Sequence, residues 1–454
     1  MNFVSSILSA RKEYVNMPTH SPYRGGENFD LRQMLLCGKR LRLQEKTAMF
    51  TAFLDDLAAN NHLLQMRVIA SAADREVTVI DRQSGSTKQM LMFGSNSYLG
   101  IANHPYVKER VLQAIREYGV GIGGPPLLNG YTRLHWELEE RLAALKGAED
   151  AMIFPAGYSA NVGLVTGLVN ETDTVLYDIY SHASFCDGVK MSGVNSAHFP
   201  HNNMAKLKAL LGVYRQRTDQ DIFVGVEGVY SMDGDLAPLD IIVPLCKSHN
   251  AILIVDDAHG TGVMGEHGRG TAERFGLEGQ VDITMGTFSK TFSATGGFVA
   301  ASKPIINYLR FFARSYMFSA SLPPTVIATV LAGLDVMEQE PERFRQLRDN
   351  VAYANNGLRK LGFALKSESP IFPLIVPVGM DLREAAHRFH DAGIFVNSIE
   401  YPAVPISQQR FRVSVMATHT RLDIDRLLEV VGEIWSSLAP RATAESTVQQ
   451  SKAA

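Results

Sequence analysis

The chain has 454 residues, 46% of them hydrophobic, which is enough for a large core and for two or more domains. A formal net charge of -3 and an isoelectric point near 6.5 leave no basic surface for nucleic acid or an anionic membrane, so no nucleic-acid partner is expected. Three scattered cysteines, no basic leader and no apolar run of about 20 residues indicate no disulfide framework, no metal site and a cytoplasmic location.

The first 90 residues are expected to form an N-terminal arm followed by a hairpin. Residues 1 to about 60 are polar and helix-prone, and we interpret them as an arm that packs over a neighbouring part of the protein. From Val77 to Met92, two strand-like pieces flank a turn at residues 83–86, a pattern that predicts a β-hairpin.

Residues 91–337 alternate helical patterns with short apolar strands. The strands are expected within AMIFPAG, DTVLYD, DIFVGVEG, AILIVDDAHG and DITMGTFSK. Because strands separated by helices usually pair in parallel, this rhythm predicts an α/β domain with a mostly parallel sheet covered by helices.

Residues 338–437 are expected to form a smaller domain. A polar helix over residues 338–356 is predicted to lead into it from the large domain. Strands within SPIFPLIVPV, GIFVNSI and RFRVSVMATHT, and a helix over Leu382–Ala392, are predicted to complete it. Residues 438–454 have little apolar surface to bury and are expected to be disordered.

The segment Ala251–Gly262 carries the first group of candidate functional residues. Its apolar run ends in Asp256, so we predict a buried strand that delivers a carboxylate to the sheet edge where α/β proteins bind ligands. A buried carboxylate needs a cationic partner. Asp257 is expected to point outward or to act as an indirect partner, because adjacent strand residues face opposite ways. His259 follows in the turn and is either a ligand or a structural hydrogen-bond donor.

The segment Asp282–Gly297 adds a lysine among small and hydroxyl-bearing residues. A solvated surface would carry more charge than the neighbourhood of Lys290, so we interpret this lysine as a desolvated nucleophile. Together with Asp256, and with the hydroxyls of Thr287 and Ser289, it predicts a site for pyridoxal phosphate. The lysine would form a Schiff base, the carboxylate would keep the pyridine nitrogen protonated, and the hydroxyls would bind the phosphate.

Three weaker signals follow other strand ends, and a fourth lies within a predicted strand. The segment Phe154–Asn161 turns from a strand into a helix, whose first amides favour phosphate. His182 could stack on a cofactor ring, and Ser231 is predicted to bind the cofactor, whereas Asp233–Asp235 fits a simple turn. Arg412 lies in a strand-like alternation and is predicted to bind a substrate carboxylate.

With these residues in place, the chain resembles the α-oxoamine synthase family of fold-type I pyridoxal phosphate enzymes. The likeness covers residues 90 to 435, in matching order, and the serine palmitoyltransferase-like bacterial branch is the most similar. It is carried by FGSNSYLG, LLNGYTRLHWELE, FPAGYSANVG, SHASFCDG, EGVYSMDGDLAPL, VDDAHGTGVMGEHGRG, GTFSKT, GGF, FSASLPP and RVSVMATHT. Ten segments in register are far more specific than any one of them.

The resemblance implies a fold and a set of residue roles. The fold would be a large domain with a mostly parallel seven-stranded sheet and a small α+β C-terminal domain. Lys290 would form the Schiff base, Asp256 would pair with the pyridine nitrogen, His259 would contact the phenolic oxygen and His182 would stack on the ring. Gly157, Tyr158, Thr287 and Ser289 would surround the phosphate, and Ser319 and Ala320 would reach it from the other subunit of an obligatory homodimer. Arg412 would bind the amino-acid carboxylate, with Asn96 nearby.

The activity implied is the condensation of an amino acid (serine, glycine or alanine) with an acyl thioester, followed by loss of carbon dioxide to give an α-amino ketone. The acyl donor would be acyl-CoA or an acyl carrier protein, and the product a precursor of sphingolipids or secondary metabolites. Two departures from the family pattern bear on specificity. Gly124, Pro125 and Pro126 replace a Gly-Ser-Arg-like run near the acyl-thioester end, and residues 400–403 lack an arginine typical of bacterial serine palmitoyltransferases.

Other interpretations of the same residues remain open. Within the family, the alternatives are a glycine C-acetyltransferase and an 8-amino-7-oxononanoate synthase. A fold-type I aminotransferase would share the lysine, the aspartate and the phosphate groups. A degenerate binding subunit is the non-enzymatic alternative, and the presence of Lys290 argues against it.

Overall fold

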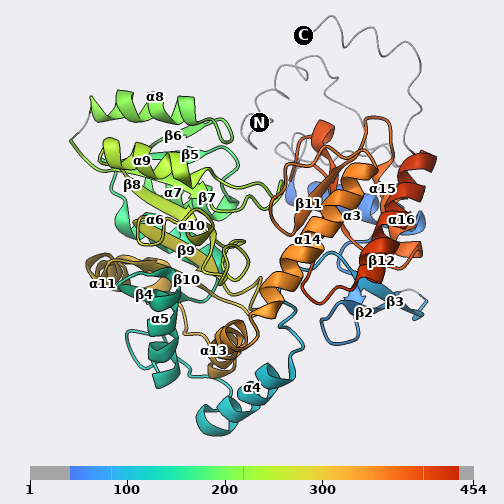
Figure 1. The fold of residues 1–454 in the computed structure, drawn as a ribbon, viewed down its shortest axis with the longest axis horizontal. Coiled ribbons are helices and arrows are strands. Elements are labelled where there is room, and N and C mark those ends of the chain that lie inside the picture. Colours follow the sequence, from blue (N-terminus) through green and yellow to red (C-terminus); the bar gives the residue numbers. More distant parts are fainter. Residues whose placement is uncertain (1–40, 83, 218, 402, 439–454) are drawn as a thin grey trace, which may run out of the picture.

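The computed structural model describes residues 41–438 except for residues 83, 218 and 402. The part of the predicted arm before residue 41 and the predicted disorder after residue 438 lie outside the described residues. Within them the chain forms two lobes, one built on a large sheet and one on two small sheets, joined through α13 (Pro324–Gln339) and α14 (Glu342–Lys360) (Figure 1).

The large sheet has seven strands in the order β4-β10-β9-β8-β7-β5-β6. They are β4 (Asp150–Phe154), β5 (Thr174–Asp178), β6 (Asn195–Phe199), β7 (Ile222–Glu227), β8 (Ile252–Asp256), β9 (Ile283–Thr287) and β10 (Gly297–Ala301). Only β10 runs antiparallel to its two neighbours, which confirms the predicted mostly parallel α/β sheet. The prediction missed β6, a largely exposed edge strand without an apolar run, and β10, whose sequence GFVAA consists mostly of small residues.

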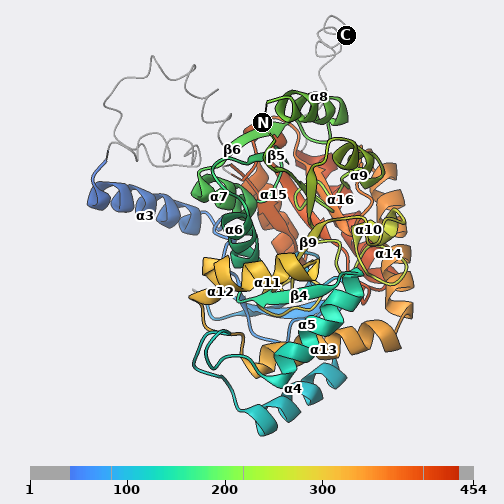
Figure 2. The same cartoon turned by 90° about the vertical axis from the view of Figure 1, so that its left-hand side faces the viewer.

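Helices cover both faces of this sheet (Figure 2). The helices between β3 (Thr87–Met92) and α14 are α4 (Pro105–Tyr118), which packs against α13, α5 (Arg133–Lys146), α6 (Gly157–Leu168), α7 (Ala183–Ser192), α8 (Met204–Arg215), α9 (Leu239–Ser248), α10 (Thr271–Arg274), α11 (Lys303–Phe312), α12 (Arg314–Met317) and α13 (Pro324–Gln339). Side chains alternate along each strand, so Met152 and Phe154 pack with α6 and α11, while Ala151 and Ile153 pack with α5 and α13.

The second lobe contains a three-stranded sheet in the order β11-β14-β13. Its elements are α14 (Glu342–Lys360), β11 (Ile371–Ile375), α15 (Leu382–Asp391), β12 (Ile394–Phe395), β13 (Asn397–Ile399), a short 3₁₀ helix (Ile406–Gln408), β14 (Arg410–Ser414) and α16 (Arg421–Leu438). The helix predicted over residues 338–356 is present as α14, but its start was wrong: α13 ends at Gln339, and α14 begins only after Pro341, which separates the two helices.

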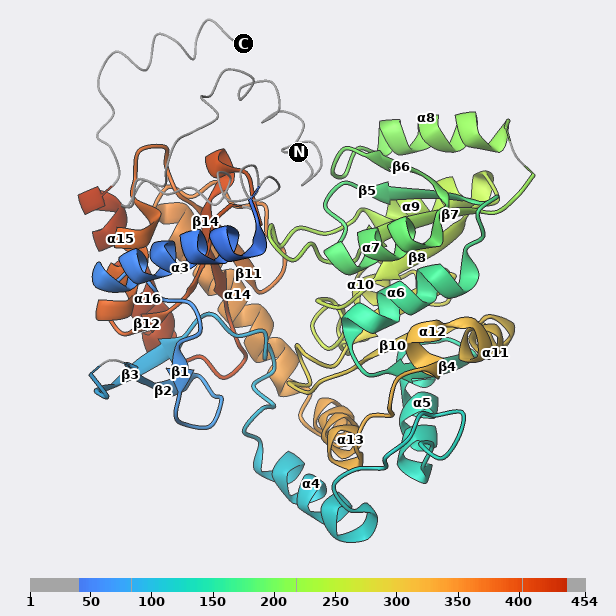
Figure 3. The ribbon, with the colours of Figure 1, turned by 180° about the vertical axis from the view of Figure 1, so that it is seen from behind.

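The expected hairpin is present, and it is part of the second lobe (Figure 3). Strands β1 (Val68–Ile69), β2 (Glu76–Ile80) and β3 (Thr87–Met92) form a sheet whose fourth strand is β12, and helix α3 (Leu43–Ala59) precedes them. The single strand predicted in GIFVNSI is therefore two: β12 pairs with β3, and β13 pairs with β14. The predicted domain boundaries stay predictions. Among the described residues, none of the helices combines the length and apolarity that a membrane crossing requires.

Candidate active site

The carboxyl ends of three parallel strands form the floor of a cavity of about 310 Å³. Glu227 at the end of β7 is in register with Asp256 at the end of β8, and Asp256 is in register with Met285 of β9. The predicted residues that line this cavity are Gly157, Tyr158, His182, Asp256, His259, Thr287, Ser289 and Lys290. Five others, Asn96, Ser231, Ser319, Ala320 and Arg412, are not among its lining residues.

Asp256 is buried and held by two donors. Its Oδ2 accepts a hydrogen bond from Nδ2 of Asn161 at 2.7 Å, and its Oδ1 accepts one from the backbone N–H of Ala258 at 3.1 Å. The same Asn161 amide also donates to Oγ of Ser184 at 2.9 Å. Sequence reasoning assigned no role to Asn161, although its position four residues after Gly157 on α6 places it on the same helix face.

Asp257 points to the opposite face of the sheet from Asp256, as strand geometry requires. It does not face solvent, because its side chain is buried and accepts hydrogen bonds from Nζ of Lys146 at 2.7 Å and from Oγ1 of Thr271 at 2.7 Å. Asp257 therefore faces away from Asp256, as predicted, and it joins Lys146 of α5 to Thr271 in the segment that follows β8.

Lys290 follows β9 and is half-buried at the cavity. Burial lowers the pKa of its ammonium from the ordinary value, and the nearby carboxyls of Asp256 and Glu227 act in the opposite direction. A lowered pKa enlarges the fraction of lysine present as a free amine, which is the nucleophilic form.

A hydrogen-bonded chain joins His259 to Arg412. Nδ1 of His259 lies 2.7 Å from the hydroxyl of Tyr98, and that hydroxyl accepts a hydrogen bond from Nη2 of Arg412 at 3.3 Å. Burial lowers the pKa of His259 well below its ordinary value, and the charges of Lys290 and Arg412 lower it further, so the imidazole is neutral. Sequence reasoning gave Tyr98 no role, because only the fold brings it against His259.

Arg412 is buried at the centre of β14 and is held by neighbours from both lobes. Its Nη1 donates to Oδ1 of Asn96 at 2.9 Å, and its Nε donates to the backbone carbonyl of Ser231 at 2.6 Å. The predicted neighbours Asn96 and Arg412 are thus brought together. Ser231 meets the site through its main chain: its carbonyl accepts from Arg412, and its N–H donates to Oε2 of Glu227 at 3.2 Å.

Small residues and hydroxyls form the opposite end of the cavity. Helix α6 begins at Gly157, where a Cβ atom would meet Oγ1 of Thr287 at 2.8 Å. That hydroxyl lies 3.0 Å from Oγ of Ser289 and donates to the carbonyl of Gly296 at 2.9 Å. A helix N-terminus beside two hydroxyls is a favourable place for a phosphate group.

Ser319 and Ala320 lie between α12 and α13, at least partly exposed and outside the cavity. The next residue, Ser321, donates its backbone N–H to the carbonyl of Gly124 at 3.0 Å. The segment that carries Pro125 and Pro126 is therefore fixed against the segment that carries Ser319 and Ala320.

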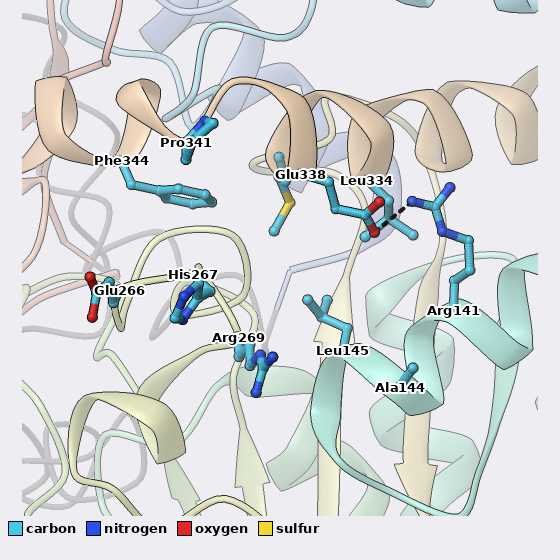
Figure 4. A pocket seen from close by; sticks show the side chains of 11 residues that line it. Arg141, Ala144, Leu145, Glu266, His267, Arg269, Leu334, Glu338, Pro341 and Phe344 are labelled. Carbon is cyan, nitrogen blue, oxygen red and sulfur yellow. Dashed lines mark hydrogen bonds and ion pairs between the residues drawn. The ribbon is translucent and has the colours of Figure 1, made fainter.

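A cavity of about 420 Å³ between α5, α13 and the start of α14 contains none of these residues (Figure 4). Its wall is largely apolar, with Leu145, Leu334 and Phe344. The cation at one end, Arg141, is already paired, with Asp335 at 2.5 Å and Glu338 at 2.9 Å. This cavity therefore offers no free charge from Arg141 and none of the chemistry expected of the site.

The residues of the smaller cavity fit pyridoxal phosphate. Asp256 has two hydrogen-bond donors that favour its charged form, as a partner for a protonated ring nitrogen requires. Lys290 supplies an amine, and the start of α6 with Thr287 and Ser289 supplies donors for a phosphate. Gly157 leaves room for close approach, since any larger residue would meet Thr287.

Comparison with known proteins agrees with this arrangement. The family model described as aminotransferase class I and II matches residues 88–431. The chain belongs to the aminotransferase class I and II family. It is 41% identical over 347 residues to a serine palmitoyltransferase of Bacteriovorax stolpii, covering 76% of this chain and 82% of that protein. It is 38% identical over 388 residues to an 8-amino-7-oxononanoate synthase of Geotalea daltonii, covering 85% and 97%.

Solved structures agree with the relatives. A serine palmitoyltransferase from S. paucimobilis with a bound PLP–myriocin aldimine superposes with a TM-score of 0.80 at 31% identity, over 88% of this chain and 99% of that one. An 8-amino-7-oxononanoate synthase from Francisella tularensis gives a TM-score of 0.66 at 25% identity, over 77% and 98%. The chain is thus a member of the α-oxoamine synthase branch of its family, with a fold-type I architecture.

Proposed function

We propose that the protein is a pyridoxal phosphate-dependent acyltransferase that condenses an amino acid with an acyl thioester, releases carbon dioxide and forms an α-amino ketone. The observation that carries the proposal is that the residues expected to bind the cofactor are connected by hydrogen bonds to the arginine expected to bind the substrate. Lys290 and Asp256 line one cavity, and the chain from His259 through Tyr98 to Arg412 runs from that cavity into β14. The relatives named serine palmitoyltransferase and 8-amino-7-oxononanoate synthase support the same reaction class.

Each residue has a task that its surroundings favour. Asp256, oriented by Asn161, would keep a proton on the cofactor's ring nitrogen, and His182 and His259, which line the same cavity, would contact the ring. Gly157, Tyr158, Thr287 and Ser289 would bind the phosphate. Ser231 stays a predicted cofactor contact, on the side of the site where it meets Glu227 and Arg412. When bound, pyridoxal phosphate supplies the electron-withdrawing ring that takes up the electrons released at the amino acid's α-carbon.

Lys290 is both the attachment point and the base. Its Nζ, with a pKa lowered by burial, takes the α-proton of the amino acid and can later return it. A neutral His259 keeps a second positive charge away from this amine. The deprotonated α-carbon then attacks the acyl thioester, the thiolate leaves, and carbon dioxide is lost from the resulting β-keto acid.

Arg412 binds the carboxylate of the amino acid. What supports this role is a buried guanidinium that no carboxylate neutralises within the described residues, fixed by Asn96 and by the carbonyl of Ser231. Four of its five N–H groups donate to Asn96, Ser231, Ser414 and Tyr98, which leaves one on Nη2 for a charge-assisted hydrogen bond to the carboxylate.

We further propose a homodimer in which Ser319 and Ala320 contribute to the partner's phosphate site. Exposed apolar side chains lie close in sequence to the two segments concerned: Leu128 follows Pro126, and Phe318 precedes Ser319. Because the Gly124–Pro126 segment is fixed against residues 319–321, the acyl donor would meet the same interface. Acyl-CoA and acyl carrier protein both remain candidate donors, and the cytoplasmic location stays a prediction.

The test is a matrix of serine, glycine and alanine against acyl-CoA and acyl-carrier thioesters of several lengths, read by carbon dioxide release and by product mass. A productive pair supports the synthase and identifies the substrates. The Lys290→Ala variant is the matched control and should release no carbon dioxide with that pair. A wild-type protein that loads with cofactor but condenses no pair would contradict the proposal.

A further inference from the structure

Glu227 is a buried carboxyl group in the cofactor cavity that the mechanism above does not use. It is the last residue of β7, it lines the cavity, and it is 3% exposed. Strand β7 pairs in parallel with β8, and Glu227 is the register partner of Asp256. Register partners on strands about 4.8 Å apart point to the same face, so the two carboxyl groups stand side by side at one edge of the sheet.

The two carboxyl groups have unequal partners. Asp256 accepts hydrogen bonds from Asn161 and from the N–H of Ala258. Glu227 accepts one, from the N–H of Ser231 to Oε2, while Oε1 is buried and has no hydrogen-bond partner in the part of the chain that the structure describes. Within those same residues, Glu227 forms no ion pair, and Lys146, the cation that binds Asp257, is on the other face of the sheet.

Two adjacent buried carboxylates cannot both be ionised without a large electrostatic penalty. The better-solvated member of such a pair keeps the charge, and the other takes a proton. Here Asp256 has the donors and must be charged to hold a ring nitrogen, so the proton belongs on Glu227. Oε1 of Glu227, the oxygen without a hydrogen-bond partner in the described residues, then becomes a hydroxyl that needs an acceptor.

We propose that Glu227 is held as a neutral carboxylic acid whose O–H donates a hydrogen bond into the cavity, to an acceptor atom of the bound cofactor, so that the negative charge of the two strand ends stays on Asp256. The inference rests on the proposed function for its acceptor. Glu227 is a positioning residue in this scheme: it makes no covalent bond, and its proton stays on the carboxyl group throughout.

The charges around Glu227 support this protonation state. Burial raises its pKa well above the ordinary value and Asp256 raises it further, whereas Lys290 and the N–H of Ser231 lower it. Asp178, at the end of β5, also raises it, and the thiol of Cys186 on α7 is neutral because burial raises its own pKa to about 11. Lys290 is the one cation among these groups, and its own pKa is lowered by burial.

Infrared difference spectroscopy tests the protonation state directly, in both the cofactor-free and the cofactor-loaded protein. Wild type minus Glu227→Gln at neutral pH should show the carbonyl band of a protonated carboxylic acid, sensitive to deuterium oxide. The matched control is Glu139→Gln, which removes an equally buried glutamate: burial raises the pKa of Glu139 too, but Arg310, which forms an ion pair with it, and the hydroxyl of Tyr131 act in the opposite direction. That control should leave the band in place. If the Glu227→Gln variant loses only the bands of an ionised carboxylate, Glu227 is charged in the wild type and the proposal is overturned.

Cofactor binding tests the donor. Glu227→Gln keeps a donor, whereas Glu227→Met keeps the length and removes it, so pyridoxal phosphate should bind the glutamine variant about tenfold or more tightly than the methionine variant. Equal affinities would refute the donor. The infrared band can be measured in the cofactor-free protein and does not depend on activity. If the protein binds no cofactor, the proposed function is contradicted, but the protonation state of Glu227 can still be measured.

Discussion

Asn161 offers the sharpest test of how the fold prepares the cofactor site. Its amide donates to the carboxylate of Asp256 at 2.7 Å, and both side chains are buried, at 1% and 7% exposure, so water compensates little for its loss. A hydrogen bond to a charged group contributes about 1.5–3 kcal/mol. At about 1.4 kcal/mol per factor of ten, Asn161→Ala should raise the Kd for pyridoxal phosphate by roughly 10- to 100-fold.

The assay is a titration of cofactor-free protein with pyridoxal phosphate, followed by the visible band of the lysine adduct. The matched control is Asn350→Ala: Asn350 is as buried, but it donates to the carbonyls of Met416 and His419, outside the cavity. It should lower stability and leave the Kd unchanged. A wild-type Kd in Asn161→Ala, or an equal loss in both variants, would refute the reasoning.

Three further predictions concern the lysine, the arginine and a histidine away from the cavity. Lys290→Ala should lose the borohydride-sensitive visible band of the loaded protein, and a band that persists would assign the attachment to another residue. Arg412→Lys should raise KM for the amino acid about tenfold or more while the visible band is kept, and an unchanged KM would exclude the carboxylate role. Burial lowers the pKa of His201, but hydrogen bonds to Asp178 and Asp235 outweigh this and raise it to about 9. Because this folded pKa exceeds the ordinary 6.5, stability from His201 is present below pH 6.5 and is lost as the pH rises to about 9. Chemical denaturation should show this decline in wild type and not in His201→Gln.

The residues that the sequence could predict are those whose local pattern already carries the chemistry. Asp256 ends an apolar strand, and Lys290 follows one among small residues, so each was a candidate from its own neighbourhood. The resemblance, not the pattern, suggested the roles of Ser319 and Ala320, and their placement outside this chain's cavity leaves those roles as predictions.

The rest depends on packing between distant segments. Nothing local distinguishes Tyr98, yet it lies between His259 and Arg412, which are more than 150 residues apart in the chain. Glu227 was visible as the end of an apolar strand, but its meaning comes from the register that sets it beside Asp256. Likewise, GIFVNSI is one apolar run that two different sheets divide between them, which no periodicity can predict.

The fate of the amino acid's carboxyl carbon tests the central claim most directly. The productive amino acid, labelled with ¹³C in its carboxyl group, is incubated with its acyl thioester and the loaded enzyme. A decarboxylating condensation predicts that the label leaves as carbon dioxide in a one-to-one ratio with an unlabelled α-amino ketone, and that Lys290→Ala releases none. Label retained in a keto acid, with the amino group passed to an acceptor, would instead show an aminotransferase and contradict the account.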